Sequence, residues 1–453
     1  MKKRVLWVCN IMLPAIAQEL NLPYSNREGW LSGIFEKVKG REESFKLGVC
    51  FPVNSFKELP VQDARMLNSW GYGIDIPLVR VKCFSLSGIE CYGFKEDVSR
   101  PDVHCFNQDV QLRVIINDFK PDIIHIFGTE FPHCMAMVRA AYRPERVLIS
   151  MQGVCKEIGD VYTMGLPEEV QNRETFRDHL RKDSIIKQQI KFLIRGAFEA
   201  EAIKHCFNVT GRTSFDREYT ARINPKAEYF HMNETMRREF YSGQWKMEDC
   251  QEHRIFLGQG DYPLKGMHFM LEAMALLLPR YPDTMLYVAG NIITNYTTLK
   301  DKLKISSYGK YLHELIEKYS LEEKVVMVGK LNAEEMKEQF LKCSVYVCPS
   351  ILENSPNTVG EAQLLGVPAA ASQAGGIPDI IEDGKDGLLF PVGDVEKLAG
   401  AIERIWDRTK DENGETLSQR LSRRAREKAR IIYDGERNYA RLLEIYEAVG
   451  KKG

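Results

Sequence analysis

The sequence lacks the cysteine patterns that stabilise small secreted domains or hold a metal ion. Its eleven cysteines are odd in number, scattered along the chain and never spaced as C-x2-C, and several fall within apolar, strand-like runs. Disulfide frameworks form in oxidising compartments and pair their cysteines, whereas buried free cysteines behave as small apolar side chains. We therefore expect reduced, mostly buried thiols in a cytoplasmic protein.

Long apolar segments and an excess of one charge are also missing. No run approaches the ~20 apolar residues that cross a bilayer. The N-terminal MKKRVLWVCN has too short an apolar core for a signal peptide, so we expect Val5–Cys9 to be a first strand. The net charge of −1 creates no field that would attract nucleic acid. The sequence shows neither an internal repeat nor a low-complexity tract.

The chain does have enough length and apolar content for several hydrophobic cores. It has 453 residues, of which 44% are hydrophobic and 28% are charged. These proportions are typical of soluble globular proteins. Because the length exceeds that of one ordinary domain, we expect two or three domains.

One stretch, Ser344–Gly376, has the pattern of a complete unit of a parallel α/β sheet. The apolar run Val345–Cys348 predicts a buried strand, and a polar loop then leads to Asn357 and Thr358, which are typical helix-capping residues. The predicted helix ends before Pro368, where a second apolar run begins. The loop after the first strand thus lies at the carboxyl end of the sheet, where such sheets bind ligands.

Two glutamates, Glu353 and Glu361, bracket the start of this predicted helix. A helix N-terminus presents free N–H groups and the positive end of the helix dipole, so it suits a phosphate. A carboxylate accepts paired hydrogen bonds from the vicinal hydroxyls of a sugar or a ribose. The spacing alone is equally typical of a solvated helix, because a chain with 63 acidic residues contains many such pairs.

Several further segments in register make this region similar to glycosyltransferase family 4, the retaining GT-B glycosyltransferases of group 1. They are the strand before the loop, PS-x2-EN-SPN, GEA, GVP, Gly375-Gly376-Ile377-Pro378 and Gly387-Leu388-Leu389-Phe390-Pro391. The resemblance is specific over residues 344–391, diffuse before residue 240, and extends over nearly the whole chain. It implies an α/β protein with the GT-B fold, in which two Rossmann-like domains face each other across a cleft.

The resemblance also implies the order of domains. We expect an N-terminal Rossmann-like acceptor domain at residues 1–240, with a helical insertion at 155–205. A polar linker at 241–253 leads to a C-terminal nucleotide-sugar domain at 254–432. A final helix within 433–453 would cross back to the N-terminal domain.

The resemblance also implies a donor site, with most of its residues in the C-terminal domain and with Gly29 and Gln152 in the N-terminal domain. The donor-binding residues would be Gly29, Gly260, Lys265, Glu353, Ser355, Pro356, Asn357, Thr358 and Glu361, and the catalytic residues would be Glu353, Lys265 and Gln152. The family usually carries an arginine where Gly260 stands, so one of two cations that clamp the donor diphosphate is absent. Arg212 or the helix dipole at Thr358 would compensate, and we expect Gly260 to occupy a positive-φ turn.

The N-terminal domain offers weaker signals. Gly29 lies at a loop–helix junction, and Gln152 stands where many family members carry a histidine. His125, inside a predicted strand, is expected to be structural. Glu130 and His133 lie beyond that strand, on a predicted loop that can reach the cleft.

The predicted helix at Asp183–Glu201 leaves two interpretations open. Its apolar stripe consists of Ile186, Ile190, Leu193, Ile194 and Ala197, and its basic stripe consists of Lys187, Lys191 and Arg195. A basic amphipathic helix binds an anionic membrane surface. The same pattern is also typical of a helix packed on a core with a solvated face.

The resemblance to family 4 implies retaining transfer of a hexosyl group from a UDP- or GDP-linked sugar to a glycan or lipid-linked acceptor, in bacterial surface polysaccharide synthesis. No D-x-D motif is present, so we expect neither a metal nor another cofactor, with Lys265 and a helix dipole stabilising the leaving diphosphate. We expect a cytoplasmic protein that binds no nucleic acid, and contact with the inner face of the membrane stays one of the two interpretations of the 183–201 helix. Two alternatives stay open: a non-catalytic nucleotide-sugar-binding protein, and another GT-B enzyme such as a nucleotide-sugar epimerase or a phosphorylase.

Overall fold

The structure is a computed structural model that describes residues 2–22, 29–41, 43–55, 61–68, 75–81, 88–105 and 107–452. The chain divides into two compact units. Unit 1 contains residues 1–156, 191–235 and 434–453, and unit 2 contains residues 157–190 and 236–433. Each unit is built on its own, mainly parallel sheet.

The sheet of unit 1 has its described strands in the order β3-β4-β5-β2-β1-β6-β7-β8-β9. The strands are β1 (Arg4–Cys9), β2 (Lys46–Val53), β3 (Val61–Asn68), β4 (Asp75–Val81), β5 (Glu90–Lys95), β6 (Ile123–Phe127), β7 (Val147–Ser150), β8 (Asn208–Gly211) and β9 (Glu228–His231). Only the pairs β3–β4 and β4–β5 among them are antiparallel. Val5 and Trp7 of β1 join one core, and Leu6 and Val8 join another. Apolar side chains thus cover both faces, as parallel sheets require.

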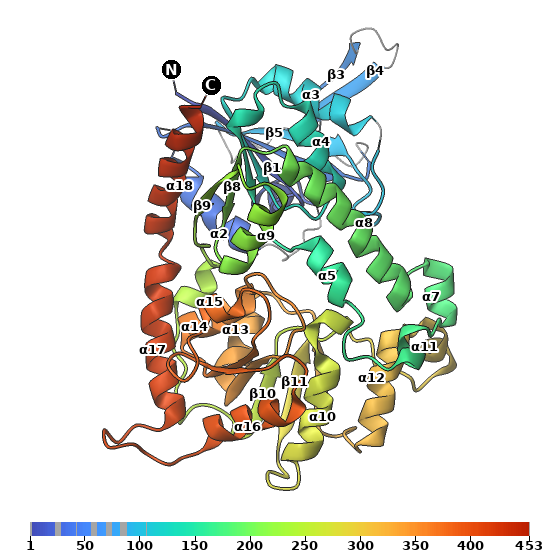
Figure 1. Cartoon of the computed structure of the whole chain (residues 1–453), viewed down its shortest axis with the longest axis vertical. Helices are drawn as coiled ribbons and strands as arrows, with labels where there is room; N and C mark the ends of the chain where they lie inside the picture. The colour runs from blue at the N-terminus through green and yellow to red at the C-terminus, as the bar shows by residue number, and fades with distance from the viewer. Residues whose placement is uncertain are drawn as a thin grey trace. The chain divides into compact units, whose positions relative to one another are not determined.

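Helices cover both faces of this sheet. On one face α2 (Gly29–Val38) and α18 (Gly435–Gly450) lie side by side (Figure 1). The other face is covered by α3 (Gln108–Phe119), α4 (Pro132–Ala140), α9 (Ser214–Ile223) and the last turns of α8 (Ile185–Lys204). Two shorter helices are α1 (Pro14–Glu19), in unit 1, and α5 (Cys155–Val161), which begins in unit 1 and continues into unit 2. The final helix predicted within 433–453 is therefore confirmed as α18.

The sheet of unit 2 has the order β12-β11-β10-β13-β14-β15, with all neighbours parallel. Its strands are β10 (Arg254–Leu257), β11 (Met285–Ala289), β12 (Val325–Gly329), β13 (Val345–Cys348), β14 (Ala369–Ser372) and β15 (Leu388–Phe390). The helices are α6 (Glu168–Gln171), α7 (Phe176–Arg181), α10 (Met267–Leu277), α11 (Leu299–Lys304), α12 (Ser307–Lys318), α13 (Ala333–Lys342), α14 (Asn357–Leu365), α15 (Ile377–Ile380), α16 (Val395–Trp406) and α17 (Leu417–Ile432). The predicted strand–loop–helix–strand unit at 344–376 is confirmed as β13, α14 and β14, with β13 central in the sheet.

Residues 157–190 belong to unit 2, although the sequence analysis places all of 155–205 in an insertion of the N-terminal domain. The reason lies in buried polar contacts. The Asp178 carboxylate, 1% exposed, accepts a hydrogen bond from the Ser307 backbone N–H at 2.8 Å. The Thr175 hydroxyl donates to the Ile305 carbonyl at 2.8 Å. Helical periodicity alone does not reveal which domain a helix packs against.

The segment predicted as a linker, 241–253, is partly packed into unit 2. Trp245 is buried in a hydrophobic core of this unit, and its indole N–H donates to the Cys343 carbonyl at 2.8 Å. Its backbone N–H donates to the Leu365 carbonyl, also at 2.8 Å.

Among the described residues, no helix combines the length and apolar content that a membrane span needs.

Candidate functional site

An ion pair lies at the carboxyl end of the unit 2 sheet. Lys265, in the short 3-10 turn Pro263–Lys265 after β10, places its ammonium 2.5 Å from the carboxylate of Glu353, in the loop after β13. The Ser350 hydroxyl donates to the same carboxylate oxygen at 2.8 Å. The two charged side chains are only 17% and 13% exposed. The structure therefore brings together two of the three predicted catalytic residues.

Glycines allow the loops after β10, β13 and β14 to approach one another closely. Gly266 has φ +68°, and a Cβ there would lie 1.9 Å from the Pro349 carbonyl oxygen. Gly375 has φ +52°, and a Cβ there would lie 2.1 Å from the carbonyl oxygen of Glu353. The Gly376 N–H also donates to that oxygen at 2.9 Å. The Gly375-Gly376 motif thus holds the backbone of Glu353 in place.

Lys265 remains a cation in this setting. Burial alone lowers the pKa of an ammonium. The negative charge of Glu353, together with nearby Tyr262 and the hydrogen bond to Glu353, outweighs burial and raises the pKa of Lys265 above its usual value. Burial has the opposite effect on the Tyr262 phenol: it raises the pKa of this group, which therefore stays neutral. The site thus offers one fixed positive charge.

Gly260 differs from the sequence expectation. Its φ is not positive, in contrast to that of Gly266, so the predicted left-handed turn is wrong. A Cβ at Gly260 would instead lie 2.6 Å from Val288 Cγ1 and 2.7 Å from Met267 Sδ. A side chain here would point into packed apolar atoms, which is why glycine suits this position.

The start of α14 is not capped in the predicted manner. The residue before the helix is Pro356, which makes no side-chain capping bond, and Asn357 and Thr358 are the first helical residues. The Thr358 hydroxyl accepts a hydrogen bond from the Tyr346 hydroxyl at 2.6 Å. The Thr358 side chain also packs against Gly258, at the end of β10. The N-terminal turn therefore keeps backbone donors without a side-chain cap, an arrangement that suits an anion.

Glu361 is paired with Arg237, a residue that the sequence analysis missed. The Arg237 Nε and Nη2 atoms donate to Glu361 Oε1 at 2.9 and 2.6 Å. Glu361 is only 2% exposed, and burial raises its pKa to about 7 although Arg237 opposes that change. Its second oxygen, Oε2, is buried without a hydrogen-bond partner among the described residues. No local motif marks Arg237, because the two residues lie 124 positions apart.

In unit 1, Glu130 links two loops at the carboxyl end of the sheet. Its carboxylate accepts from the Gly153 N–H at 2.7 Å and from the Asn10 side-chain amide at 2.9 Å. Gly153 directly follows Gln152, the third predicted catalytic residue, which is half-buried. Glu130 is therefore hydrogen-bonded to the loop that carries Gln152.

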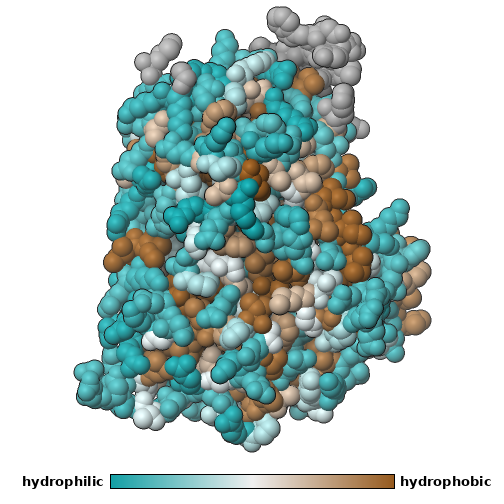
Figure 2. All heavy atoms as spheres, viewed as in Figure 1, coloured by the Kyte–Doolittle hydropathy of each residue, from teal (hydrophilic) through white to brown (hydrophobic). Residues whose placement is uncertain are grey.

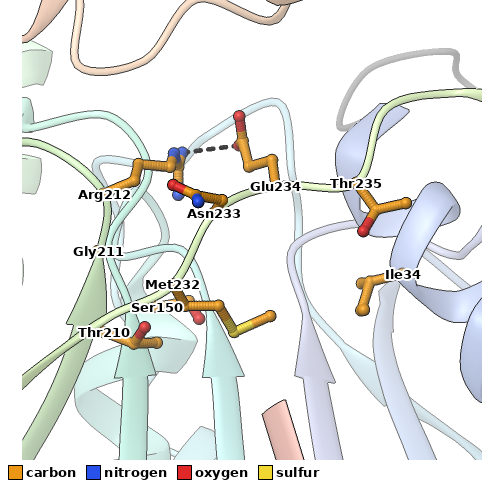
Figure 3. Close-up of a pocket in the computed structure, with 9 residues that line it drawn as sticks. All are labelled: Ile34, Ser150, Thr210, Gly211, Arg212, Met232, Asn233, Glu234 and Thr235. Atoms are coloured by element: carbon orange, nitrogen blue, oxygen red, sulfur yellow. Dashed lines mark ion pairs between the residues drawn. The ribbon is translucent and has the colours of Figure 1, made fainter. Parts of the chain in front are cut away.

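Arg212 already has a counter-ion. Its Nη2 atom lies 2.9 Å from Glu234 Oε1, and its Nη1 atom donates to the Met151 carbonyl at 2.9 Å. Figure 3 shows the two charged side chains facing each other across the rim of a small hollow. The hollow is lined by Ile34, Ser150, Thr210, Gly211, Arg212, Met232, Asn233, Glu234 and Thr235. Arg212 is thus paired with Glu234 as Lys265 is with Glu353, and its compensation for the cation absent at Gly260 stays a prediction.

The two histidines have structural positions. His125 is confirmed as structural, since its ring nitrogens lie 2.7 Å from the Tyr446 hydroxyl and 2.7 Å from Ser150 Oγ. Burial lowers its pKa to about 3, so it is uncharged at neutral pH. The expectation that His133 reaches a cleft is wrong. It is fully buried in α4, with Nδ1 2.6 Å from a carboxylate oxygen of Glu96.

Gly29 and the basic stripe of α8 were also predicted to have a role. Gly29 is the first residue of α2, and residues 23–28 before it fall outside the described part of the chain. On α8, Lys187 pairs with Glu174. Arg195 Nε donates to the Glu130 carbonyl at 2.8 Å. Two of the three cations of the basic stripe are therefore engaged within the protein.

Comparisons with known proteins agree with this architecture. Residues 239–428 match the family model of glycosyl transferases group 1. The amylovoran biosynthesis glycosyltransferase AmsK of Erwinia amylovora is 30% identical over 133 residues, which cover 28% of this chain and 31% of that protein. The chain spans less than half of the length of the first curated relatives it matches.

Solved structures match over the whole chain. Sucrose-phosphate synthase from Thermosynechococcus elongatus has a TM-score of 0.64 at 14% identity and covers 99% of both chains. HepE from Anabaena, solved with UDP and glucose, has a TM-score of 0.62 at 13% identity and covers 99% of this chain and 100% of its own. The fold is GT-B. The GT-B architecture expected from the sequence is thus confirmed. At 14% and 13% identity, these similarities support the fold and give no information on activity.

Proposed function

We propose that this GT-B protein is a retaining glycosyltransferase of family 4. It would move a hexosyl group from a UDP- or GDP-linked sugar to a glycan or lipid-linked acceptor, in bacterial surface polysaccharide synthesis. The observation that carries the proposal is the Lys265–Glu353 pair beside the uncapped start of α14, within the segment that matches the group 1 transferases. The names of relatives such as AmsK support a role in polysaccharide synthesis.

The residues of unit 2 suit the donor. The Lys265 ammonium and the first N–H groups of α14 supply positive charge for a diphosphate. Glu353 supplies a carboxylate that accepts hydrogen bonds from sugar hydroxyls. The Glu361 Oε2 atom, buried and without a hydrogen-bond partner among the described residues, suits a ribose hydroxyl. Unit 1 would bind the acceptor.

The site would accelerate transfer by stabilising the charge of the transition state more than the charge of the bound donor. The bond from the anomeric carbon to the diphosphate breaks, a bond to the acceptor oxygen forms on the same face, and the proton of the acceptor hydroxyl passes to the leaving diphosphate. Because the transition state is oxocarbenium-like, negative charge grows on the leaving diphosphate. Lys265 and the α14 donors are fixed before that charge develops, so they need no rearrangement. In this proposal no metal or other cofactor participates.

A panel of radiolabelled UDP- and GDP-sugars tests the proposal. A transferase should release free nucleotide slowly without acceptor, should do so faster with the true acceptor, and should work in EDTA. Lys265→Ala should slow both reactions by ~10²–10³-fold, whereas Lys330→Ala, an exposed lysine of the same unit, should keep the wild-type rates. Binding without nucleotide release would instead support the non-catalytic alternative, which the glycine at 260 and glutamine at 152 favour. Interconversion of two sugars without transfer would support an epimerase.

A further inference from the structure

Two short helices of unit 2, α7 and α11, lie side by side (Figure 1). Both are fixed to the rest of the unit. The Thr175 hydroxyl, at the start of α7, donates to the carbonyl of Ile305, the residue directly after α11. Asp178 of α7 is buried and bonded to Ser307 at the start of α12. The pair therefore forms a rigid surface element, and not a loose loop.

This pair exposes four large apolar side chains. Phe176 and Leu180 of α7 are 59% and 66% exposed, and Leu299 and Leu303 of α11 are 76% and 48% exposed. Within each helix the two side chains are four residues apart, so they share one face. Figure 2 shows hydrophobic surface at the right margin, over these two helices. Single exposed apolar residues are ordinary, but a cluster on adjacent helices marks a contact surface. We call these four residues the α7–α11 platform.

Cations surround the platform. They are Arg181, Lys182, Lys300, Lys302 and Lys304, all exposed. None of them forms an ion pair with a carboxylate in the described part of the chain. The acidic residues of the same helices are used internally, because Asp178 is bonded to Ser307 and Asp301 closes the capping box at Thr298. Asp301 also interacts electrostatically with Lys300, so the surface combines apolar side chains with an excess of positive charge and not with positive charge alone.

This combination fits an anionic lipid surface better than a protein partner. The buried centres of protein interfaces are depleted in lysine, whereas half of the six residues of α11 are lysines. Amphipathic helices that lie in the membrane interface carry lysine and arginine beside leucine and phenylalanine. Long basic side chains can also extend toward phosphate groups while their neighbours enter the acyl region.

We propose that the α7–α11 platform docks on a bilayer that contains anionic lipids, with Phe176, Leu180, Leu299 and Leu303 inserted at the interface. The surrounding lysines and arginine contact lipid phosphates. This surface differs from the basic stripe of α8, where Lys187 and Arg195 are engaged within the protein. The inference does not depend on the transfer reaction, because it rests only on exposed groups of unit 2.

Co-sedimentation of the full chain with vesicles tests the proposal. The wild type should partition to phosphatidylcholine vesicles with about 30% phosphatidylglycerol, and much less to phosphatidylcholine alone. Leu180→Ser/Leu299→Ser should reduce partitioning about ten-fold or more, and high salt should release only part of the wild type. Lys300→Gln/Lys302→Gln/Lys304→Gln should remove the preference for anionic lipid. The matched control, Arg424→Gln/Arg430→Gln/Ile431→Ser on α17, changes equally exposed groups and should bind like the wild type.

Three outcomes would overturn the proposal. They are no binding of the wild type to anionic vesicles, undiminished binding of the platform variant, and a concentration-dependent dimer that Leu180→Ser/Leu299→Ser abolishes. The last outcome would identify the platform as an interface between copies of the chain. Thermal unfolding monitored by circular dichroism should show unchanged Tm for every variant, because the substituted side chains are exposed. Undiminished binding of the platform variant, combined with loss of binding when the charges of Lys187, Lys191 and Arg195 are reversed, would place the docking surface on α8.

Discussion

At the scale of single residues, the charged groups of the candidate donor site are already paired within the protein. Lys265 contacts Glu353, and Arg237 contacts Glu361. A phosphate or a hydroxyl must therefore share or replace an internal partner. Removing one member of such a buried pair leaves an uncompensated charge, so each variant needs a measure of stability beside its activity.

Lys265→Ala should lower kcat by ~10²–10³-fold with the true donor and change KM less. Negative charge on the bridging oxygen is greater in the transition state than in the bound donor, so the loss appears mainly in turnover. Steady-state kinetics and the Tm of the variant separate lost catalysis from lost folding. Turnover equal to that of the wild type would place the diphosphate clamp elsewhere.

Gly260→Arg should not rescue Lys265→Ala. A Cβ at this position meets Val288 and Met267, so the arginine side chain would begin inside packed atoms. Overpacking of this kind typically costs ~1–3 kcal/mol, and thermal unfolding should show the loss. Restored turnover in the double variant would show that the local packing opens toward the donor.

Glu361 should make stability depend on pH. Burial raises its pKa to about 7, against about 4.3 for an unfolded glutamate. Between these values the native protein holds a proton that the unfolded chain has lost, so this group lowers the free energy of unfolding as the pH rises, by up to ~4 kcal/mol. The Tm of Glu361→Gln minus that of the wild type should therefore increase from about pH 5 to about pH 8. Glu322→Gln, an exposed control, should show no such trend, and a flat difference for Glu361→Gln would contradict the burial argument.

At the scale of elements, the loop after β13 is positioned by glycines that the sequence analysis had already identified. Gly375-Gly376 belonged to the quoted motif, and the structure shows that it contacts the backbone of Glu353. The cap of α14 could not be predicted in the same way. Asn357 and Thr358 are good capping residues in general. The helix begins directly after Pro356, however, so both of them are helical residues and neither is the cap.

Gly375→Ala should destabilise the protein and reduce activity. The added methyl group would lie 2.1 Å from the Glu353 carbonyl oxygen at a φ of +52°, so the loop must move. We expect a loss of ~1–3 kcal/mol, together with a fall in kcat, as Glu353 leaves its position. Gly414→Ala is the matched control, because Gly414 also has a positive φ, +77°, but has open space around it. The control should lose some stability and no activity; equal activity losses in both variants would argue against a role for the Gly375 contact.

At the scale of the whole molecule, the first and last parts of the chain join in unit 1. The Trp7 indole N–H donates to the Tyr446 hydroxyl of α18 at 2.8 Å, and that hydroxyl also contacts His125. Arg41 and Lys37 pair with Glu436 at the start of the same helix. Unit 1 is therefore complete only with residues 434–453 in place.

Tyr446→Phe should lower the free energy of unfolding by ~1–3 kcal/mol, because it leaves buried polar groups of Trp7 and His125 without their partner. Chemical denaturation measures this change. Tyr142→Phe, a tyrosine of the same unit that is 60% exposed, should be neutral. Similar stability of both variants would mean that the buried hydroxyl contributes nothing to unit 1.

The sequence by itself determined the α/β class, the strand–loop–helix–strand order of residues 344–376 and the last helix. Apolar runs, turn residues and helical spacing are properties of neighbouring residues, so they are legible without the fold. The tertiary structure alone decided which charges meet and where segments pack. Arg237 and Glu361 pair across 124 positions, Arg212 is balanced by Glu234, and residues 157–190 join unit 2. Such contacts bring together residues distant in sequence and leave no periodic trace in the chain.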